Sequence, residues 1–383
     1  MNNTDLLTFA DVKKLAQVHE PGCVSIYIPS TPGPIDSDVA RIEVKNRLRD
    51  AVHQLQAADA GKELINEIAA RVDALLEDDD FWRNKSNSLA VFVSPSFTVT
   101  YRLPGTLNGL TQVSDRLYLK PLMGAFTFGR AAFVLALSKH SVRLIAVKPD
   151  QPAALIQVAG MPKDIESEIP LDLTNDRSTL GHLRLSEDPK VRLREFSQAI
   201  DRKVQEATAG SDWPLIIAAA EPVASIYRSV STSRHLAPET IAGSPDERSI
   251  EELASSARLC LDGLHADELT EVKTEFEERP NEDLASTKLD DVAVAAVYKA
   301  IGTLFVDVEA HVPGHVDQEN GELTLDAEDD ASNHCVVDEI LSRAILSDAK
   351  ILAVGAGDVP GGGPVAAVFR FAPPHAAQPG EDD

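Results

Sequence analysis

The chain has 383 residues, of which 43% are hydrophobic and 5% aromatic, and its formal net charge at pH 7 is −25. This length predicts two or three domains with aliphatic cores rather than one compact domain. The start of the sequence lacks a basic region followed by a long apolar run, and the longest apolar stretches are much shorter than a membrane span. We therefore expect no signal peptide, no membrane helix and a cytoplasmic protein.

The charge is distributed unevenly along the chain. Residues 1–125 contain 13 Lys and Arg against 16 Asp and Glu, residues 126–245 contain 14 of each, and residues 246–383 contain 9 against 31, a balance of −22. The first two thirds are thus neutral enough to approach RNA. The acidic last third suits a protein partner, or serves solubility alone.

The first third has an α/β pattern. A short strand is expected over 24–29, a long helical region over 37–80, and two strands over 89–94 and 97–103. In the helical region Val39, Ile42, Leu48, Val52 and Leu55 recur at helical spacing. We place the first domain, an N-terminal α/β domain, at residues 1–124.

The middle third alternates strands and helices. Strands are expected over 131–137 and 142–147 around a turn at 138–141, then a polar loop over 171–187, a helix over 190–206, a strand over 215–220 and a helix beginning at 223–229. This order is typical of a mixed or parallel sheet covered by helices. We place the second domain at residues 125–245.

The last third begins with a long acidic helix over 249–278 and continues with helices over 290–302 and 335–346. Strands are expected over 304–308, 350–354 and 365–371. We place the third domain at residues 246–372, and we expect the tail at 373–383 to be disordered.

A glycine-rich loop lies between the last two strands, with Gly361, Gly362 and Gly363 flanked by prolines. A phosphate-binding loop leads into a helix and carries Lys and Ser or Thr, whereas this loop leads into a strand. A hairpin-type connection is the better interpretation. The alternative is an unrelated small-molecule enzyme that uses this loop for a nucleotide.

No catalytic or metal-binding pattern stands out. His311 and His315 flank a Pro-Gly pair, which argues against convergence on a metal. The cysteines, Cys23, Cys260 and Cys335, are scattered, and no nucleophile elbow occurs. We therefore predict no metal and no cofactor.

Two basic segments of the middle third are candidates for RNA binding. One is the start of the helix after Asp188 and Pro189, together with the polar loop before it, and the other is the acid-poor stretch after the 215–220 strand. The alternatives are a solvated helix with internal ion pairs and an ordinary surface loop. The candidate residues are Arg177, His182, Arg184, Lys190, Arg192, Arg194, Arg228, Arg234 and His235. Val191, Phe196, Ile200 and Val204 are expected on the buried face of the helix.

Several segments together resemble the bacterial members of the archaeo-eukaryotic release factor superfamily, relatives of eukaryotic release factor 1 and Pelota. They are Val24–Pro29 with Val44–Arg49, Phe133–Ile145, Leu215–Arg228, Ile301–Val306 with Gly314–Asp317, and Pro360–Phe371. The resemblance covers all three thirds of the chain. It implies an RNase H-like middle domain, an L7Ae-like C-terminal domain, and a protein that enters the ribosomal A site and contacts rRNA.

The resemblance also bears on whether this protein hydrolyses peptidyl-tRNA. True release factors of this superfamily hydrolyse peptidyl-tRNA with a Gly-Gly-Gln tip before the basic helix, but no Gly-Gly-Gln occurs in this chain. We therefore expect a non-catalytic stress factor similar to the hibernation factor Balon, with elongation factor Tu or another translational GTPase docked on the acidic last third. The alternative is a peptidyl-tRNA-hydrolysing release or rescue factor in which His182 or a backbone group replaces the tip.

Overall fold

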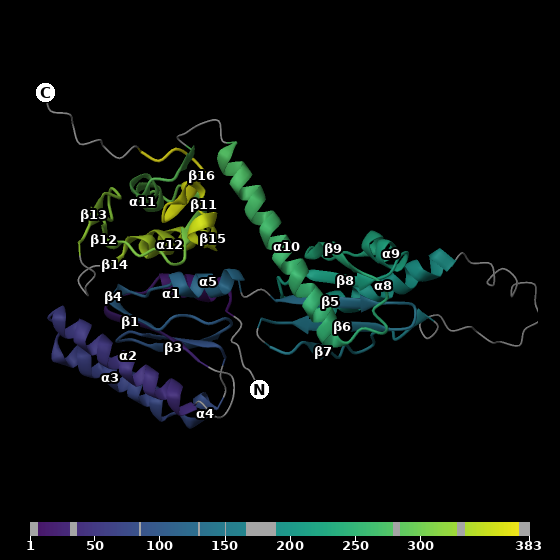
Figure 1. Cartoon of the computed structure of the whole chain (residues 1–383), viewed down its shortest axis with the longest axis horizontal. Coiled ribbons are helices and arrows are strands. Elements are labelled where there is room, and N and C mark those ends of the chain that lie inside the picture. Colours follow the sequence, from purple (N-terminus) through teal and green to yellow (C-terminus); the bar gives the residue numbers. More distant parts are fainter. Residues whose placement is uncertain are drawn as a thin grey trace, which may run out of the picture. The chain divides into compact units, whose positions relative to one another are not determined.

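The computed structural model describes residues 7–30, 37–83, 86–128, 131–149, 151–165, 189–278, 284–327 and 334–374. They form two compact units (Figure 1): Met1–Gly129 with Glu268–Asp383, called the split unit below, and Arg130–Asp267, called the middle unit. Three domains with boundaries at residues 124 and 245 were expected, and this division stays a prediction. The compact units differ from it in that residues near both ends of the chain belong to the same unit.

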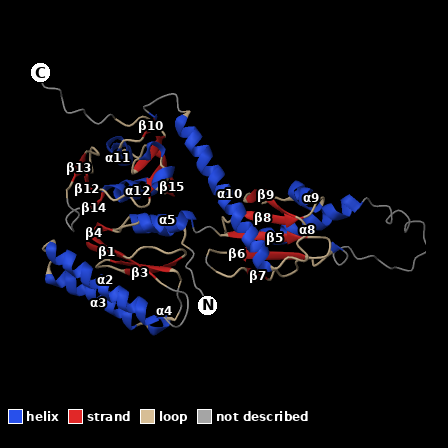
Figure 2. Ribbon diagram, viewed as in Figure 1, coloured by secondary structure: helices blue, strands red, loops and turns tan. Residues whose placement is uncertain are grey.

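The N-terminal part of the split unit is an antiparallel sheet with the strand order β3-β2-β1-β4. The strands are β1 (His19–Pro29), β2 (Ser88–Val93), β3 (Thr98–Leu103) and β4 (Leu110–Arg116). One face of this sheet packs on helices α2 (Ser37–Ala57) and α3 (Lys62–Glu77), and the other packs on α1 (Phe9–Ala16) and α5 (Lys120–Phe128) (Figure 2). Because both faces are covered, β1 is buried from Cys23 to Ile28.

The helical region expected over 37–80 is two helices lying side by side (Figure 1) and a short third one, α4 (Asp79–Trp82). The chain turns between α2 and α3, where Asp59 has a left-handed φ of 55°. Two of the residues that recur at helical spacing, Val39 and Ile42, do not pack on the sheet: their exposed fractions are 63% and 58%. The stripe of α2 that faces the sheet is Ala40, Val44, Leu48, Ala51 and Leu55.

The C-terminal part of the split unit has a mixed sheet with the order β10-β16-β11-β15. Its strands are β10 (Ala285–Ser286), β11 (Ile301–Asp307), β15 (Lys350–Val354) and β16 (Val365–Phe369). Helices α11 (Leu289–Val297) and α12 (Val336–Leu346) cover one face, and the end of α10 (Ile250–Glu277) covers the other. The helix expected over 290–302 is shorter, because Lys299 has a φ of 57° and β11 begins two residues later.

A small antiparallel sheet with the order β13-β12-β14 adjoins this part. Its strands are β12 (Pro313–Val316), β13 (Leu323–Leu325) and β14 (His334–Cys335).

The glycine-rich loop is not a hairpin. Strand β11 lies between β15 and β16, parallel to the first and antiparallel to the second, so the loop passes over the end of β11. The loop contains two short 3-10 turns, η3 (Ala356–Asp358) and η4 (Pro360–Gly362). Gly361 and Gly362 have φ of 77° and 65°, which only glycine adopts without strain. The two glycines therefore allow the chain to reverse its direction between β15 and β16.

A common core joins the two parts of the split unit. Residues of α1, β1, β2 and α5 belong to the same buried cluster as residues of α11, β11, α12 and β16. Polar contacts cross the junction as well: Arg116 at the end of β4 forms an ion pair with Glu339 of α12 at 2.8 Å, and the exposed fractions of the two side chains are 9% and 0%. Removing either partner of a buried ion pair is destabilising, so this contact stabilises the packing of the two parts on each other.

The middle unit has one five-stranded sheet with the order β7-β6-β5-β8-β9. The strands are β5 (Ala132–Leu137), β6 (Val142–Val147), β7 (Ala154–Ile156), β8 (Leu215–Ala219) and β9 (Leu236–Ala242). Strand β6 is antiparallel to both of its neighbours, β5 and β7, and β8 and β9 run parallel to β5. This arrangement agrees with the RNase H-like topology expected for this domain, and the α/β class is confirmed in both units.

Helices cover both faces of the middle sheet. Helices α8 (Pro189–Thr208) and α9 (Val223–Val230) pack on one face, and the first half of α10 packs on the other through Leu253, Ala254, Ala257 and Leu261. These contacts explain why the middle unit extends to residue 267 rather than 245.

Candidate nucleic-acid interface

The first two turns of α8 present cations to solvent. Leu193, Phe196 and Ile200 fix the helix on the middle sheet, and they are 2%, 0% and 0% exposed. Lys190 and Arg194, one helical turn apart, are exposed, and Arg192 is half-buried. Val191 was expected on the buried face but is 45% exposed between these cations, and Leu193 takes its place in the core.

The internal ion pairs considered for this helix occur at its other end. Lys203 pairs with Glu206 at 2.7 Å. In the part of the chain that the structure describes, neither Arg192 nor Arg194 forms an ion pair with a carboxylate. Their guanidinium groups therefore remain available to an external anion.

A turn of the middle sheet adds a further cation that the sequence patterns did not single out. Strand β5 is parallel to β8, and α8 leads back to the start of β8, so the β5–β6 turn and the start of α8 lie at the same edge of the sheet (Figure 1). Lys139 and His140 in this turn are exposed. We call the surface formed by Lys139, Lys190, Arg192 and Arg194 the basic edge.

The turn that carries Lys139 is held by a carboxylate. Asp246 accepts hydrogen bonds from the hydroxyl groups of Ser138 and Ser141, both at 2.6 Å. Burial raises the pKa of Asp246, but these two hydrogen bonds outweigh it and the net pKa is lowered. The side chain is thus an ionised anchor, with its oxygens occupied by hydroxyl donors.

The residues of the second basic segment have different surroundings in the structure. Arg228 of α9 donates to the carbonyl oxygens of Ala237 and Glu239 at 2.8 and 3.0 Å and to Thr240 Oγ1 at 2.7 Å. The guanidinium group of Arg228 therefore fastens β9 to α9 rather than facing a ligand. Arg234 and His235 are exposed in the turn that follows α9, and His235 Nε2 lies 3.8 Å from Asp212.

A buried carboxylate in α8 shapes that turn. Asp201, 3% exposed, accepts from Tyr227 Oη (3.0 Å), Ser231 Oγ (2.8 Å), and the backbone N–H and hydroxyl of Thr232 (2.9 and 2.8 Å). Burial and the Asp201 charge raise the pKa of Tyr227, so its hydroxyl stays a donor. In the sequence, this role was indicated by the position of Asp201, a carboxylate on the otherwise apolar face of the helix.

The structure does not bring the two basic segments together. The N–H of Leu215, at the start of β8, donates to the carbonyl of His235, so Arg234 and His235 lie at the opposite edge from the start of α8. A helix as long as α8 separates the two edges, roughly 30 Å at 1.5 Å per residue. Arg177, His182 and Arg184 lie outside the described residues.

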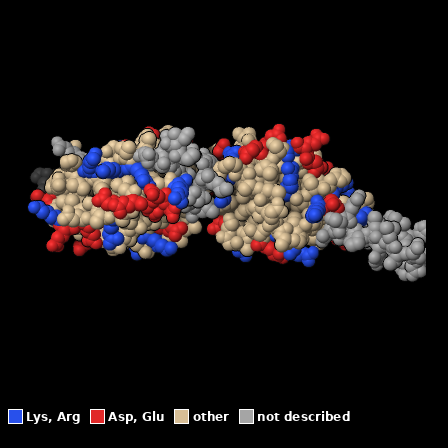
Figure 3. Space-filling view, turned by 90° about the horizontal axis from the view of Figure 1, so that it is seen from below, with Lys and Arg blue, Asp and Glu red and all other residues tan. Residues whose placement is uncertain are grey.

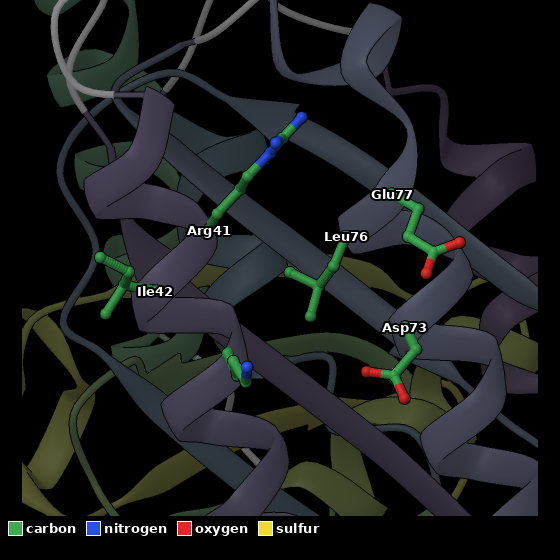
Figure 4. A pocket seen from close by; sticks show the side chains of 6 residues that line it. Arg41, Ile42, Asp73, Leu76 and Glu77 are labelled. Carbon is green, nitrogen blue, oxygen red and sulfur yellow. The ribbon is translucent and has the colours of Figure 1, made fainter.

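The split unit carries a shallow groove of a different character. Its volume is about 460 Å³, and it lies between α2 and α3 (Figure 4). It is lined by Arg41, Ile42 and Lys45 of α2 and by Asp73, Leu76 and Glu77 of α3. Leu76 lies between the two helices, whereas Ile42 points to the side of α2 away from α3 (Figure 4). Side chains of both signs lie beside one another on this unit (Figure 3). The acidic wall makes the groove unsuitable for a nucleic-acid backbone.

No group of three His, Cys, Asp or Glu within the described residues is arranged to hold a metal ion. No helix among these residues combines the length and the apolar character needed to cross a membrane.

The middle unit is thus an α/β domain with a mixed sheet, helices on both faces and a cationic edge. Residues 129–267 match the family model described as bacterial archaeo-eukaryotic release factor family 11, and these are the residues of the middle unit with one more at its start. The middle unit is therefore similar to this bacterial release factor family, and the match covers about a third of the chain.

Three solved structures are similar to the chain at low sequence identity. An archaeal Pelota, in a model of ribosome-bound Pelota and ABCE1, shares 12% identity over 96% of this chain and 95% of its own, with a TM-score of 0.40. Dom34 of S. cerevisiae, described as a translation termination-like factor interacting with Hbs1, shares 11% over 75% and 80%, with a TM-score of 0.42. The archaeal termination factor aRF1 shares 14% over 95% and 99%, with a TM-score of 0.23. No curated protein sequence matches the chain.

Proposed function

We propose that this protein binds the ribosomal A site as a non-catalytic hibernation or stress factor. The observation that carries the proposal is the release factor-like middle unit combined with a sequence that contains no Gly-Gly-Gln. The protein would thereby occupy the site of a release factor without cleaving peptidyl-tRNA.

The chemistry at the tip supports the absence of hydrolysis. Two adjacent glycines give a backbone the freedom to approach a scissile ester closely, which a residue with a Cβ hinders. Between residues 166 and 188 the sequence contains one glycine, Gly181, followed by His182. A single glycine without the glutamine offers neither that freedom nor the side-chain amide.

The basic edge supports binding to rRNA. Lys139, Arg192 and Arg194 have no carboxylate partner within the described residues, and arginine pairs with phosphate oxygens through two parallel hydrogen bonds. Phosphate contacts of this kind fix the position of a protein on RNA without reading its sequence.

A GTPase partner belongs to the same proposal. The last third of the chain carries 31 acidic against 9 basic residues, which repels RNA and favours a basic protein surface. We infer that elongation factor Tu or a related translational GTPase docks there. Binding of the purified protein to elongation factor Tu with a GTP analogue tests this part, and absence of binding at tens of micromolar would contradict it.

Co-sedimentation with purified ribosomes tests the main proposal. We expect the wild-type protein to pellet with vacant ribosomes, and we expect the double variant R192E/R194E to bind at least about tenfold more weakly, because two phosphate contacts become repulsions. The comparison variant is R234E, which reverses one exposed charge at the opposite edge of the same unit and should change binding less than about threefold.

Three results would overturn the proposal. A wild-type protein that never pellets with ribosomes contradicts ribosome binding. Equal losses in R192E/R194E and R234E contradict the basic edge as the contact. Release of peptide from peptidyl-tRNA above the spontaneous rate contradicts the non-catalytic role and favours the rescue alternative, in which H182A should then abolish release.

A further inference from the structure

The outer face of the helix pair α2 and α3 carries more apolar surface than a solvated face requires. Val39 and Ile42, three residues apart on α2, are 63% and 58% exposed, and Leu76 of α3 is half-buried beside the groove. The inner faces of both helices are already used, because Val44 and Val72 pack on the sheet. The outer face is therefore a second apolar stripe with no partner within the described residues.

Three charged side chains beside this stripe, Lys45, Asp73 and Glu77, form no ion pair within the described residues. Lys45 of α2 and Asp73 and Glu77 of α3 line the same groove, yet no ion pair joins Lys45 to either carboxylate among the described residues (Figure 4). Arg41, at the end of the groove, is instead held by Asp79 and by the ring of Trp82. The groove thus has the cation Lys45 on one side and the anions Asp73 and Glu77 on the other, with Leu76 between the helices, and these three charges are available to a partner.

This pattern is complementary to itself. A two-fold axis running along the groove, in the plane of the contact, places α2 of one copy on α3 of the other at the same level. Lys45 of each copy then meets Asp73 and Glu77 of its partner. An isologous interface needs a patch that matches itself under a two-fold rotation. An RNA backbone would match only the α2 wall.

We propose that α2 and α3 form a homodimer interface, in which each α2 packs on the α3 of a second copy. The helix pair spans roughly 24 Å by 20 Å, so the two copies together would bury on the order of 1,000 Å², at the lower limit for specific association. The dimer is therefore weak and reversible, and it forms at micromolar concentrations.

Sedimentation equilibrium of the full-length protein over a range of concentrations tests this inference. We expect a monomer–dimer equilibrium, with a dissociation constant about tenfold higher for K45E, because each reversed charge counts twice in a two-fold dimer. The triple variant K45E/D73K/E77K exchanges the two walls and should restore the wild-type constant. The control is K14E on α1, which packs on the other face of the sheet and should leave the equilibrium unchanged.

Three results would overturn the proposed homodimer. A wild-type protein that stays monomeric up to about 100 µM overturns the inference, since an interface of this size should associate by then. So does a dimer that K45E leaves unchanged, or a triple variant that stays as weak as K45E. Circular dichroism of each variant verifies that the helices are intact, and because Lys45, Asp73 and Glu77 are exposed, all should fold.

Discussion

Replacing Asp338 by alanine should destabilise the split unit more than most single substitutions. Asp338 of α12 is 3% exposed, and its Oδ1 accepts from the backbone N–H groups of Leu119 and Lys120 at 2.9 and 2.6 Å. These groups lie at the start of α5, so Asp338 caps a helix from 218 positions away in the sequence. It joins the two parts of the unit.

The size of the effect follows from the two donors. Each buried N–H left without an acceptor costs about 1–3 kcal/mol, so D338A should lose roughly 2–5 kcal/mol of unfolding free energy. The matched variant is D338N, whose amide oxygen can accept both bonds. It should lose less than about half as much.

The pH dependence gives a second readout. Burial raises the pKa of Asp338 to about 6 from 3.8, although the hydrogen bonds from Lys120 and Leu119 act in the opposite direction. A carboxyl whose pKa is higher in the folded protein favours folding while it is protonated. Its contribution is therefore full below pH 3.8 and declines as the pH rises through 6. D338N should lack this decline.

Urea unfolding at several pH values measures both effects. The chain has two tryptophans, and Trp82 is buried in the split unit while Trp213 lies in the middle unit, so a W213F background confines the fluorescence signal to the split unit. A D338A variant within about 1 kcal/mol of wild type would refute the capping role. Equal losses in D338A and D338N would show that the charge, and not the acceptor, matters.

Three further predictions concern other anchors. Asp201→Ala should destabilise the middle unit by about 3 kcal/mol in urea, because it leaves the buried hydroxyl of Tyr227 without an acceptor and removes the bonds from Ser231 and Thr232; an effect below about 1 kcal/mol would contradict this. Arg228→Ala should cost about 1–2 kcal/mol in the same assay but leave ribosome co-sedimentation of the folded protein unchanged, and a selective loss of ribosome binding would restore Arg228 as a contact. Gly321→Ala should destabilise the split unit by about 2 kcal/mol, because φ is 80° and a Cβ would lie 2.6 Å from Val294 Cα; wild-type stability would refute this.

Much of the fold was predictable from local patterns. The apolar run at 131–137 forms the central strand β5, and the segment that begins with Asp188 and Pro189 forms α8. Both were predictable because a buried strand and an amphipathic helix have patterns that are visible in consecutive residues. The candidate cations Lys190, Arg192 and Arg194 followed from the same helix. Lys139 did not, since its place beside them depends on the direction of β5 relative to β8.

Other features depend on contacts that no local pattern encodes. Val39 and Ile42 fit a helical stripe but point away from the sheet, because Val44 and Leu48 face it once α3 fixes the rotation of α2. Arg228 lies in a basic segment, yet carbonyl groups of β9 take up its donors. The sequence shows a side chain's charge but not which partner neutralises or binds it.

The sequence by itself determined the order of the elements, the α/β class and the cations at the start of α8, since each depends on neighbouring residues. Only the tertiary structure decided that the two ends of the chain share one core around Arg116, Asp338 and Glu339. It also separated Arg234 from Arg194 by the length of a helix. The physical reason is that burial and pairing depend on residues distant in the sequence, and only the folded chain brings those residues into contact.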